Sequence, residues 1–291
     1  MTEGVADSSS ILKLVNKTLE LPTLPEVLIK LNQIIAEPES TADQVAKVIS
    51  TDPSVSTNIL RIVNSAYYGL QVRVSSINLA VSIMGFSMTK KVALKAAVFS
   101  MFARKKDNKC KHFDPAGFWK HSVFTGVAAK VLGAESKRFR DHHGEDLYIC
   151  GLLHDIGKII LLENDEERYT QVLEQAAQSG RPELEVETEV LGFNHADVGS
   201  VLAIKWFLPE DLTIAIRYHH TPTKDPFQKS LSSLIHLADR LAWNSSYPST
   251  VDTKAPELDI EVYDQVCLDP QKVEALLPQV HEDFDATDMP W

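Results

Sequence analysis

A histidine–aspartate pair, His154-Asp155, lies inside a mostly apolar run that covers residues 147–162. Such a run belongs in the protein interior, where an unpaired polar group costs roughly 2–7 kcal/mol and a charge costs more. A metal ion is a fitting partner, because it binds neutral imidazole and carboxylate together. Gly151 and Gly157 lie three residues before and after His154, and we expect them to leave room for other side chains. The pair therefore predicts a buried metal site.

The composition indicates a globular protein. The chain has 291 residues, of which 44% are hydrophobic, enough for a sizeable core. No apolar stretch approaches the roughly 20 residues that span a bilayer, and the polar, acidic N-terminus does not resemble a signal peptide. The net charge of −11 disfavours nucleic acid and anionic membrane as partners. Three cysteines without a CxxC spacing are typical of reduced thiols, so we expect a cytoplasmic protein.

Helix signals recur along the chain, whereas strand signals are nearly absent. Thr41 to Gln44 forms a capping box, and Asp52-Pro53 and Asp114-Pro115 each place an N-cap before proline at the first helical position. The helices that we expect cover residues 42–50, 53–66, two segments that begin at Ser76 and Ser87 with Gly85 between them, 115–133, 146–163, 166–178, 183–191, 195–207, 209–219 and 229–244, followed by two short acidic helices.

These elements predict an all-α fold of two packed helical bundles. The expected parts are an N-terminal tail at residues 1–18, a first bundle at 19–112, a second bundle at 113–245 and an acidic C-terminal extension at 246–291. The polar residues 245–258 are interpreted as a linker or surface loop. Residues 76–103 also resemble a helix-turn-helix, but their apolar positions and the acidic chain favour a pair of bundle helices over DNA binding.

Further potential ligands lie at inward-facing positions of the expected helices. His121 shares a helical face with apolar residues, and Asp239 lies in an apolar helix, where an unpaired carboxylate is costly. Helical bundles build dinuclear sites from ligands that project from facing helices. Each histidine by itself is more simply a hydrogen-bonded core or surface residue, and His236 could orient a ligand. Together, the candidate metal ligands are His121, His154, Asp155, His195, His219, His220 and Asp239.

The order His121, His154-Asp155, Asp239 resembles the H…HD…D order of the HD superfamily of metal-dependent phosphohydrolases. The rest of the chain resembles the HDOD family, the HD-related output domain of bacterial signalling proteins. This resemblance covers roughly residues 19–240 and implies a regulatory, all-α module whose second bundle is HD-domain-like. The segments that carry it are Leu21–Pro25, Ile49–Pro53, Leu60–Tyr68, Ile77–Gly85, Leu191–Gly199, Trp206–Pro209 and His219–Pro222.

The ligand order is also similar to that of the HD-GYP cyclic-dinucleotide phosphodiesterases. This resemblance implies that Asp155 bridges two metals and that Lys158 contacts a substrate phosphate. Two departures disfavour a third metal and hydrolysis of a cyclic dinucleotide: Gly117 stands where some relatives place a glutamate, and the segment TPTKDPF after His220 lacks the DGxGYP signature. The implied ligands are His121, His154 and Asp239 for one metal and His195, His219 and His220 for the other.

Nitrogen-rich ligation without thiolate suits two transition-metal ions, iron or manganese, with zinc as a further option. Two metals that share a carboxylate would supply a water of lowered pKa for phosphoester hydrolysis, and Lys158, Arg217 or Arg240 could neutralise the phosphate. The same site could instead stabilise the fold or couple occupancy to packing. We favour a regulatory module that acts through unidentified signalling proteins. The alternative is a metal-dependent phosphohydrolase or phosphodiesterase that acts on a nucleotide, with Asp155 and Lys158 as catalytic residues.

Overall fold

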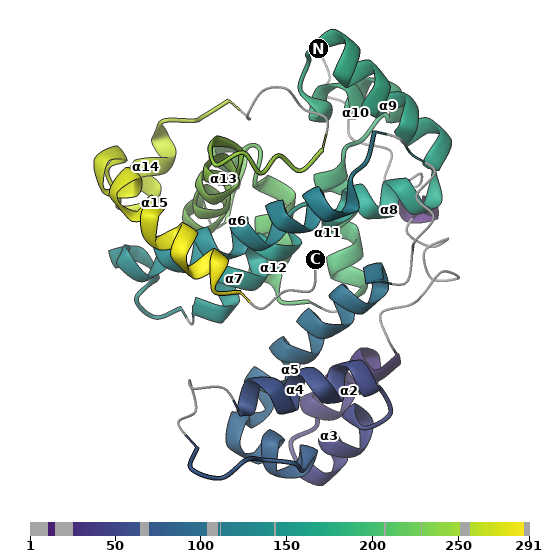
Figure 1. Ribbon diagram of the computed structural model, residues 1–291. Helices are drawn as coiled ribbons and strands as arrows, with labels where there is room; N and C mark the ends of the chain where they lie inside the picture. Colours follow the sequence, from purple (N-terminus) through teal and green to yellow (C-terminus); the bar gives the residue numbers. More distant parts are fainter. Residues whose placement is uncertain are drawn as a thin grey trace. The chain divides into compact units, whose positions relative to one another are not determined.

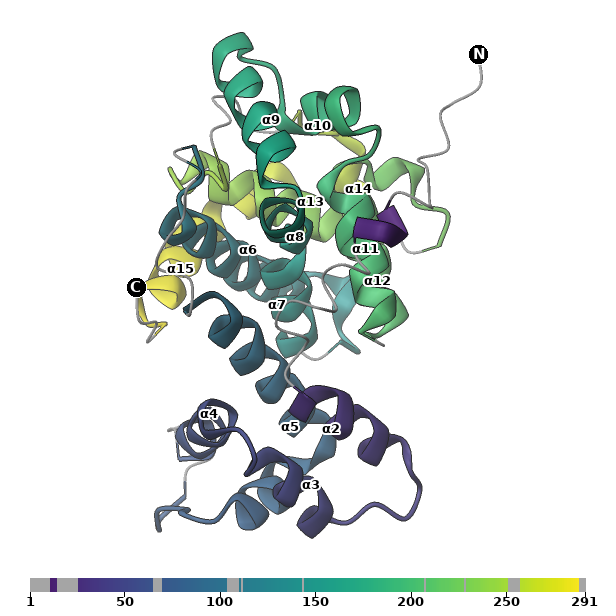
Figure 2. The same ribbon diagram turned by 90° about the vertical axis from the view of Figure 1, so that its right-hand side faces the viewer.

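The computed structural model of the protein describes residues 11–14, 26–64, 70–103, 110, 112–142, 144–206, 208–227, 229–250 and 257–287. Regular structure within these residues is helical throughout (Figures 1 and 2), which confirms the all-α fold. The chain divides into a smaller unit, residues 19–107, and a larger unit, residues 1–18 with 108–291. Among the described helices, none is long and apolar enough to cross a membrane.

Several sequence expectations fall outside the described residues. They are most of the N-terminal tail, the segment Leu21–Pro25, residues 65–68 of the motif Leu60–Tyr68, residues 65–66 of the helix expected at 53–66, Phe207, and residues 251–256 of the expected linker.

The smaller unit is built on a long kinked helix. Its capping box at Thr41 is present: the Thr41 hydroxyl accepts from the backbone N–H of Gln44, and the Gln44 side chain accepts from the backbone N–H of Thr41. Gly85 has φ 74° and ψ 165°, outside the helical range, so α5 consists of the two expected helices, which meet at this glycine. Helices α2, α3 and α4 pack against α5. Their bounds are α2 Glu26–Ala36, α3 Ala42–Ile49, α4 Pro53–Val63 and α5 Ile77–Ala103.

In the larger unit, the buried helix α6 packs against α7, α13 and α15. Asp114 caps α6 as predicted, because its side chain accepts from the Ala116 backbone N–H. Figure 1 shows α14 and α15 in yellow beside α13 and α6, and Figure 2 shows α8 beside α9 and α11. The helix bounds are α6 Pro115–Glu135, α7 Gly144–Leu153, α8 Ile156–Asn164, α9 Glu166–Ser179, α10 Glu183–Leu191, α11 His195–Lys205, α12 Glu210–Tyr218, α13 Lys229–Asn244, α14 Glu261–Val266 and α15 Pro270–Asp285, with 3₁₀ turns η2 Lys137–Phe139 and η3 Pro222–Lys224.

The single helix expected over residues 146–163 is wrong: the chain forms two helices, α7 and α8, that are broken at His154-Asp155. Asp155 has φ −97° and ψ 9°, outside the helical range. The Nδ1–H of His154 donates to the carbonyl of Gly151 at 2.7 Å, which satisfies a carbonyl at the end of α7. Neighbouring residues of an unbroken helix point in different directions. The break instead allows both side chains of the pair to reach one site.

Gly151 and Gly157 allow close contacts between helices. A Cβ atom on Gly151 would lie 2.7 Å from the Cα of Gly126 in α6, and one on Gly157 would lie 1.9 Å from the carbonyl oxygen of His195 in α11. Helix backbones, rather than other side chains, therefore occupy the space beside these glycines. The two contacts hold the ligand-bearing helices α6 and α11 against the helix break.

We predict that Gly157→Ala lowers the free energy of unfolding by about 1–3 kcal/mol, since the added methyl group overlaps the His195 carbonyl and must push α8 and α11 apart. Urea unfolding measures the change. Gly144→Ala is the matched control, because a Cβ atom there meets the flexible side chain of Lys130 at 3.2 Å. Equal stability of the two variants would contradict the tight contact.

Candidate metal centre

The structure brings all the candidate metal ligands together in the larger unit, in two groups. Six of the seven are buried with at most 2% of their surface exposed, and His220 is partly exposed. They come from α6, the α7–α8 break, α11, the end of α12, and α13. The first group contains His121, His154 and Asp239, and the second contains Asp155, His195, His219 and His220, with the ligand atoms of each group within 4.8 Å of one another.

The histidines of the first group turn their Nε2 atoms toward each other. His121 Nε2 is 3.2 Å from His154 Nε2 and 3.2 Å from Asp239 Oδ1. Both Nδ1 atoms donate to carbonyl oxygens at 2.7 Å, that of His121 to Tyr247 and that of His154 to Gly151. Because a carbonyl oxygen only accepts, Nδ1 carries a proton in both rings, and Nε2 is the atom left to bind a metal. Ligands about 2.0–2.1 Å from one ion lie about 3.0–3.4 Å apart, which agrees with these separations.

The charge states of the first group also suit a metal. Burial, together with the neighbouring His219, lowers the pKa of His154 to about 4 despite the adjacent carboxylates, so this ring is neutral at pH 7. Burial alone would raise the pKa of Asp239, but His121 and His154 lower it to about 2. The group therefore offers a neutral imidazole at His154 and a carboxylate at Asp239, the forms that bind metal ions.

The second group gathers around one oxygen of Asp155. Its Oδ1 is 3.1 Å from His195 Nε2 and 3.4 Å from His219 Nε2, and His220 Nε2 is 2.8 Å from His195 Nε2. The Nδ1–H of His219 donates to the Ile216 carbonyl at 2.7 Å, so Nε2 is the atom left to bind a metal. This Nε2 has no hydrogen-bond partner among the described residues. A metal ion would satisfy the buried atom, which otherwise costs about 1–3 kcal/mol.

The two oxygens of Asp155 face different groups of ligands. While Oδ1 faces His195 and His219, Oδ2 is 3.5 Å from His154 Nε2 and 3.0 Å from Lys158 Nζ. Burial would raise the pKa of Asp155, but His154, Lys158 and His195 hold it well below its usual range. This ionised carboxylate has the geometry of a ligand shared by two ions.

Glu187 on α10 supports the second group and was missed by the sequence analysis. It is fully buried, and its Oε2 accepts from His195 twice, from the ring Nδ1–H at 2.7 Å and from the backbone N–H at 2.9 Å. Metal-bound histidines commonly donate their second N–H to a carboxylate in this way. Although burial acts against it, Glu187 and Asp155 raise the pKa of His195 to about 10. The space between His195 and Asp155 thus attracts positive charge.

Lys158 lies within the same buried network rather than at the surface. Its Nζ is 3.0 Å from Asp155 Oδ2 and 3.5 Å from Glu183 Oε2, and it donates to Ser249 Oγ at 2.6 Å. Glu183 in turn accepts from the hydroxyl of Tyr169 at 2.5 Å. Burial and the Glu183 charge raise the pKa of Tyr169 well above its usual range, which keeps this hydroxyl protonated as a donor.

Three other residues that the sequence singled out are not among the candidate metal ligands. His236 donates from Nδ1 to the backbone carbonyl of His219 at 2.7 Å and so supports the chain that carries two ligands. Arg217 forms an ion pair with Asp197. Gly117 lines a cavity near the start of α6.

This fold and site define a class of protein: a helical module in which histidine and aspartate side chains gather at one buried centre. A family model of the HDOD domain matches residues 21–222. The chain therefore belongs to the HDOD family.

The chain is 27% identical over 221 residues to an uncharacterized protein of Treponema pallidum, a match that covers 76% of this chain and 42% of that longer relative. Three solved structures are similar. A candidate signal transduction protein from Marinobacter aquaeolei has a TM-score of 0.73 at 23% identity, with 98% of this chain and 64% of that chain covered. An HDOD domain protein of unknown function from Geobacter sulfurreducens has a TM-score of 0.69 at 20% identity, with 96% of this chain and 99% of that chain covered. A candidate metal-dependent phosphohydrolase from Shewanella amazonensis has a TM-score of 0.60 at 20% identity, with 95% of this chain and 99% of that chain covered. At these identities the likeness shows the fold.

We predict that Glu187→Gln weakens metal binding by the second group about 10–100-fold, because a weaker acceptor holds the His195 ring less firmly. Titration of metal-free protein with Zn²⁺ against a coloured chelator resolves the weakened equivalent from the unchanged one. Glu185→Gln on the same helix is the control, since Glu185 is exposed and pairs with Arg181. Wild-type affinity in Glu187→Gln would show that this carboxylate does not support the site.

Proposed function

We propose that this protein is a bacterial signalling output module that acts in the cytoplasm, holds two transition-metal ions at the centre described above, and regulates other proteins by binding them. The observation that carries the proposal is the position of Asp155, whose two oxygens face separate sets of histidine nitrogens. His121, His154 and Asp239 would hold one ion, and His195, His219 and His220 the other, with Asp155 between them. Five imidazoles and two carboxylates suit iron or manganese, with zinc as a further option.

The enclosure of Lys158 supports a regulatory role over a catalytic one. The side chain that would contact a substrate phosphate is 3% exposed and is held by Asp155, Glu183 and Ser249. A metal at the centre would join helices that are far apart in sequence, so its binding free energy would add to the stability of the unit. Occupancy would then shift the population of packing arrangements that a signalling partner recognises.

A second function, hydrolysis of a nucleotide phosphoester, is supported by the same observation that the two oxygens of Asp155 face different sets of histidines. When bound, a pair of metals supplies a water of lowered pKa. In this chain Asp155 would fix the positions of the two ions. The ammonium group of Lys158 would release Ser249 and neutralise the substrate phosphate. The name of the Shewanella amazonensis neighbour agrees with this chemistry.

Metal analysis of protein expressed with added iron and manganese tests the metal centre. We expect about two equivalents in the wild type and in Asp141→Ala, which changes an exposed aspartate, and a loss of at least about half of the metal in Asp155→Ala, because this residue contacts both groups. Less than about half an equivalent in the wild type would contradict the proposed centre.

Assays of the fully loaded protein against a panel of nucleotides separate the two functions. The regulatory function predicts no turnover, together with a signalling protein that binds the wild type and not Asp155→Ala. Turnover that disappears in Asp155→Ala and persists in Asp141→Ala would overturn the regulatory function in favour of hydrolysis.

A further inference from the structure

Residues Ser246 to Thr250, here called the strap, cover the metal centre on one side. The carbonyl of Tyr247 accepts from His121 Nδ1 at 2.7 Å, and Ser249 Oγ accepts from Lys158 Nζ at 2.6 Å. The hydroxyl of Thr250 donates to the carboxylate of Glu183. Three positions of this short segment therefore bond to a candidate ligand or to the charged groups beside it.

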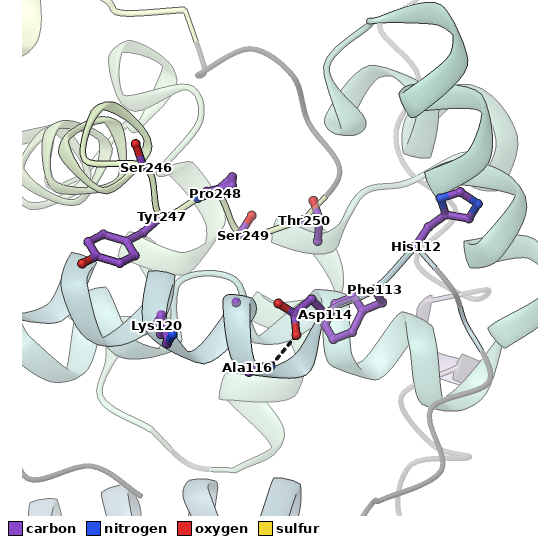
Figure 3. A pocket seen from close by; sticks show the side chains of 11 residues that line it. His112, Phe113, Asp114, Ala116, Lys120, Ser246, Tyr247, Pro248, Ser249 and Thr250 are labelled. Atoms are coloured by element: carbon purple, nitrogen blue, oxygen red, sulfur yellow. Dashed lines mark hydrogen bonds between the residues drawn. The ribbon is translucent and has the colours of Figure 1, made fainter. Parts of the chain in front are cut away.

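A cavity of about 480 Å³ lies on the other side of the strap. Figure 3 shows strap side chains along one wall and Asp114, Ala116 and Lys120 of the start of α6 along the other. Lys120 lines this cavity, whereas the next residue, His121, is 0% exposed and belongs to the metal centre. The cavity has the size of a small-molecule site. The strap thus separates a ligand-sized space from the candidate metal ligands.

The two ends of the strap are held by different forces. The Tyr247 ring packs against Phe124 and Phe284, with both ring centroids 5.1 Å away, and its backbone N–H donates to the Ala242 carbonyl at 3.0 Å. Ser249, which is 3% exposed, and Thr250 are instead tied by side-chain hydrogen bonds to charged groups. The Ser249–Thr250 end can therefore lift without loss of the aromatic contacts at Tyr247.

We propose that the strap is a gate between the cavity and the metal centre, and that it opens at its Ser249–Thr250 end. Opening breaks the bonds from Lys158 to Ser249 and from Thr250 to Glu183. It joins the cavity to Lys158 and to Asp155 Oδ2, which is 3.0 Å from the lysine. Metal ions and small ligands then reach the centre through the cavity. This inference rests on the proposed metal centre.

The bond at Tyr247 holds the fixed end of the strap to the centre. The Tyr247 carbonyl accepts from His121 Nδ1 at 2.7 Å, and the aromatic contacts of the Tyr247 ring keep this end in place when the Ser249–Thr250 end lifts. Opening therefore changes access to the centre, and the rate of metal release reports it.

The rate at which excess EDTA removes Co²⁺ from the loaded protein tests the gate. Ser249→Ala should release the metal about tenfold faster than the wild type, because it removes a hydrogen bond to a charged group, and Ser249→Ala with Thr250→Val should release it faster still. Ser82→Ala is the matched control: Ser82 is an exposed serine of α5, outside the strap and the larger unit, so this variant should keep the wild-type rate. Equal rates in all four proteins would overturn the gate.

A second measurement tests the strap without metal. Carbethoxylation of His121 by diethylpyrocarbonate, followed by mass spectrometry of the metal-free protein, should be faster in Ser249→Ala than in the wild type and Ser82→Ala. The exposed His142 is the internal reference. If the protein retains no metal, the proposed function fails and this rate alone decides the gate: faster modification supports it, and an unchanged rate overturns it.

Discussion

The carboxylate of Asp155 is buried between two sets of histidine nitrogens, and the larger unit is organised around this contact. An ionised group in such a place needs positive charge beside it. Lys158 lies 3.0 Å from Oδ2, and His195, whose pKa is raised to about 10, lies 3.1 Å from Oδ1. The helix break at His154-Asp155 frees the pair to face this site, while the glycines on either side bring α6 and α11 close enough to contribute ligands. The backbone carbonyls and Glu187 that accept from the histidine Nδ1 atoms leave Nε2 facing inward.

Much of the fold could be predicted because helix ends depend on nearby residues. The capping box at Thr41 and the Asp114-Pro115 start of α6 are local signals, and both are present in the structure. The break between α7 and α8 could not be predicted in the same way, since the apolar run continues on both sides of it. The non-helical backbone of Asp155 is set by ligand side chains from other helices, and these contacts leave no mark in the local sequence.

The candidate ligands could be selected from the sequence because polar residues on apolar helical faces are costly without a partner, and because their order resembles that of a known superfamily. The supporting residues were harder to find. Glu183 and Glu187 lie in an acidic helix that looks solvated, although their spacing of four places them on one face with the buried Val186. Tyr247 and Ser249 lie in a polar segment interpreted as a linker, whose contacts with the centre depend entirely on tertiary structure. The match of the HDOD family model over residues 21–222 identifies the module.

Anomalous diffraction from crystals of the manganese- or iron-loaded protein tests the role of Asp155 most directly. We expect two metal peaks about 3.5–4 Å apart, one beside His121, His154 and Asp239 and the other beside His195, His219 and His220, with one Asp155 oxygen bound to each. A single peak, or two peaks without Asp155 between them, would contradict a shared carboxylate at the centre of this protein.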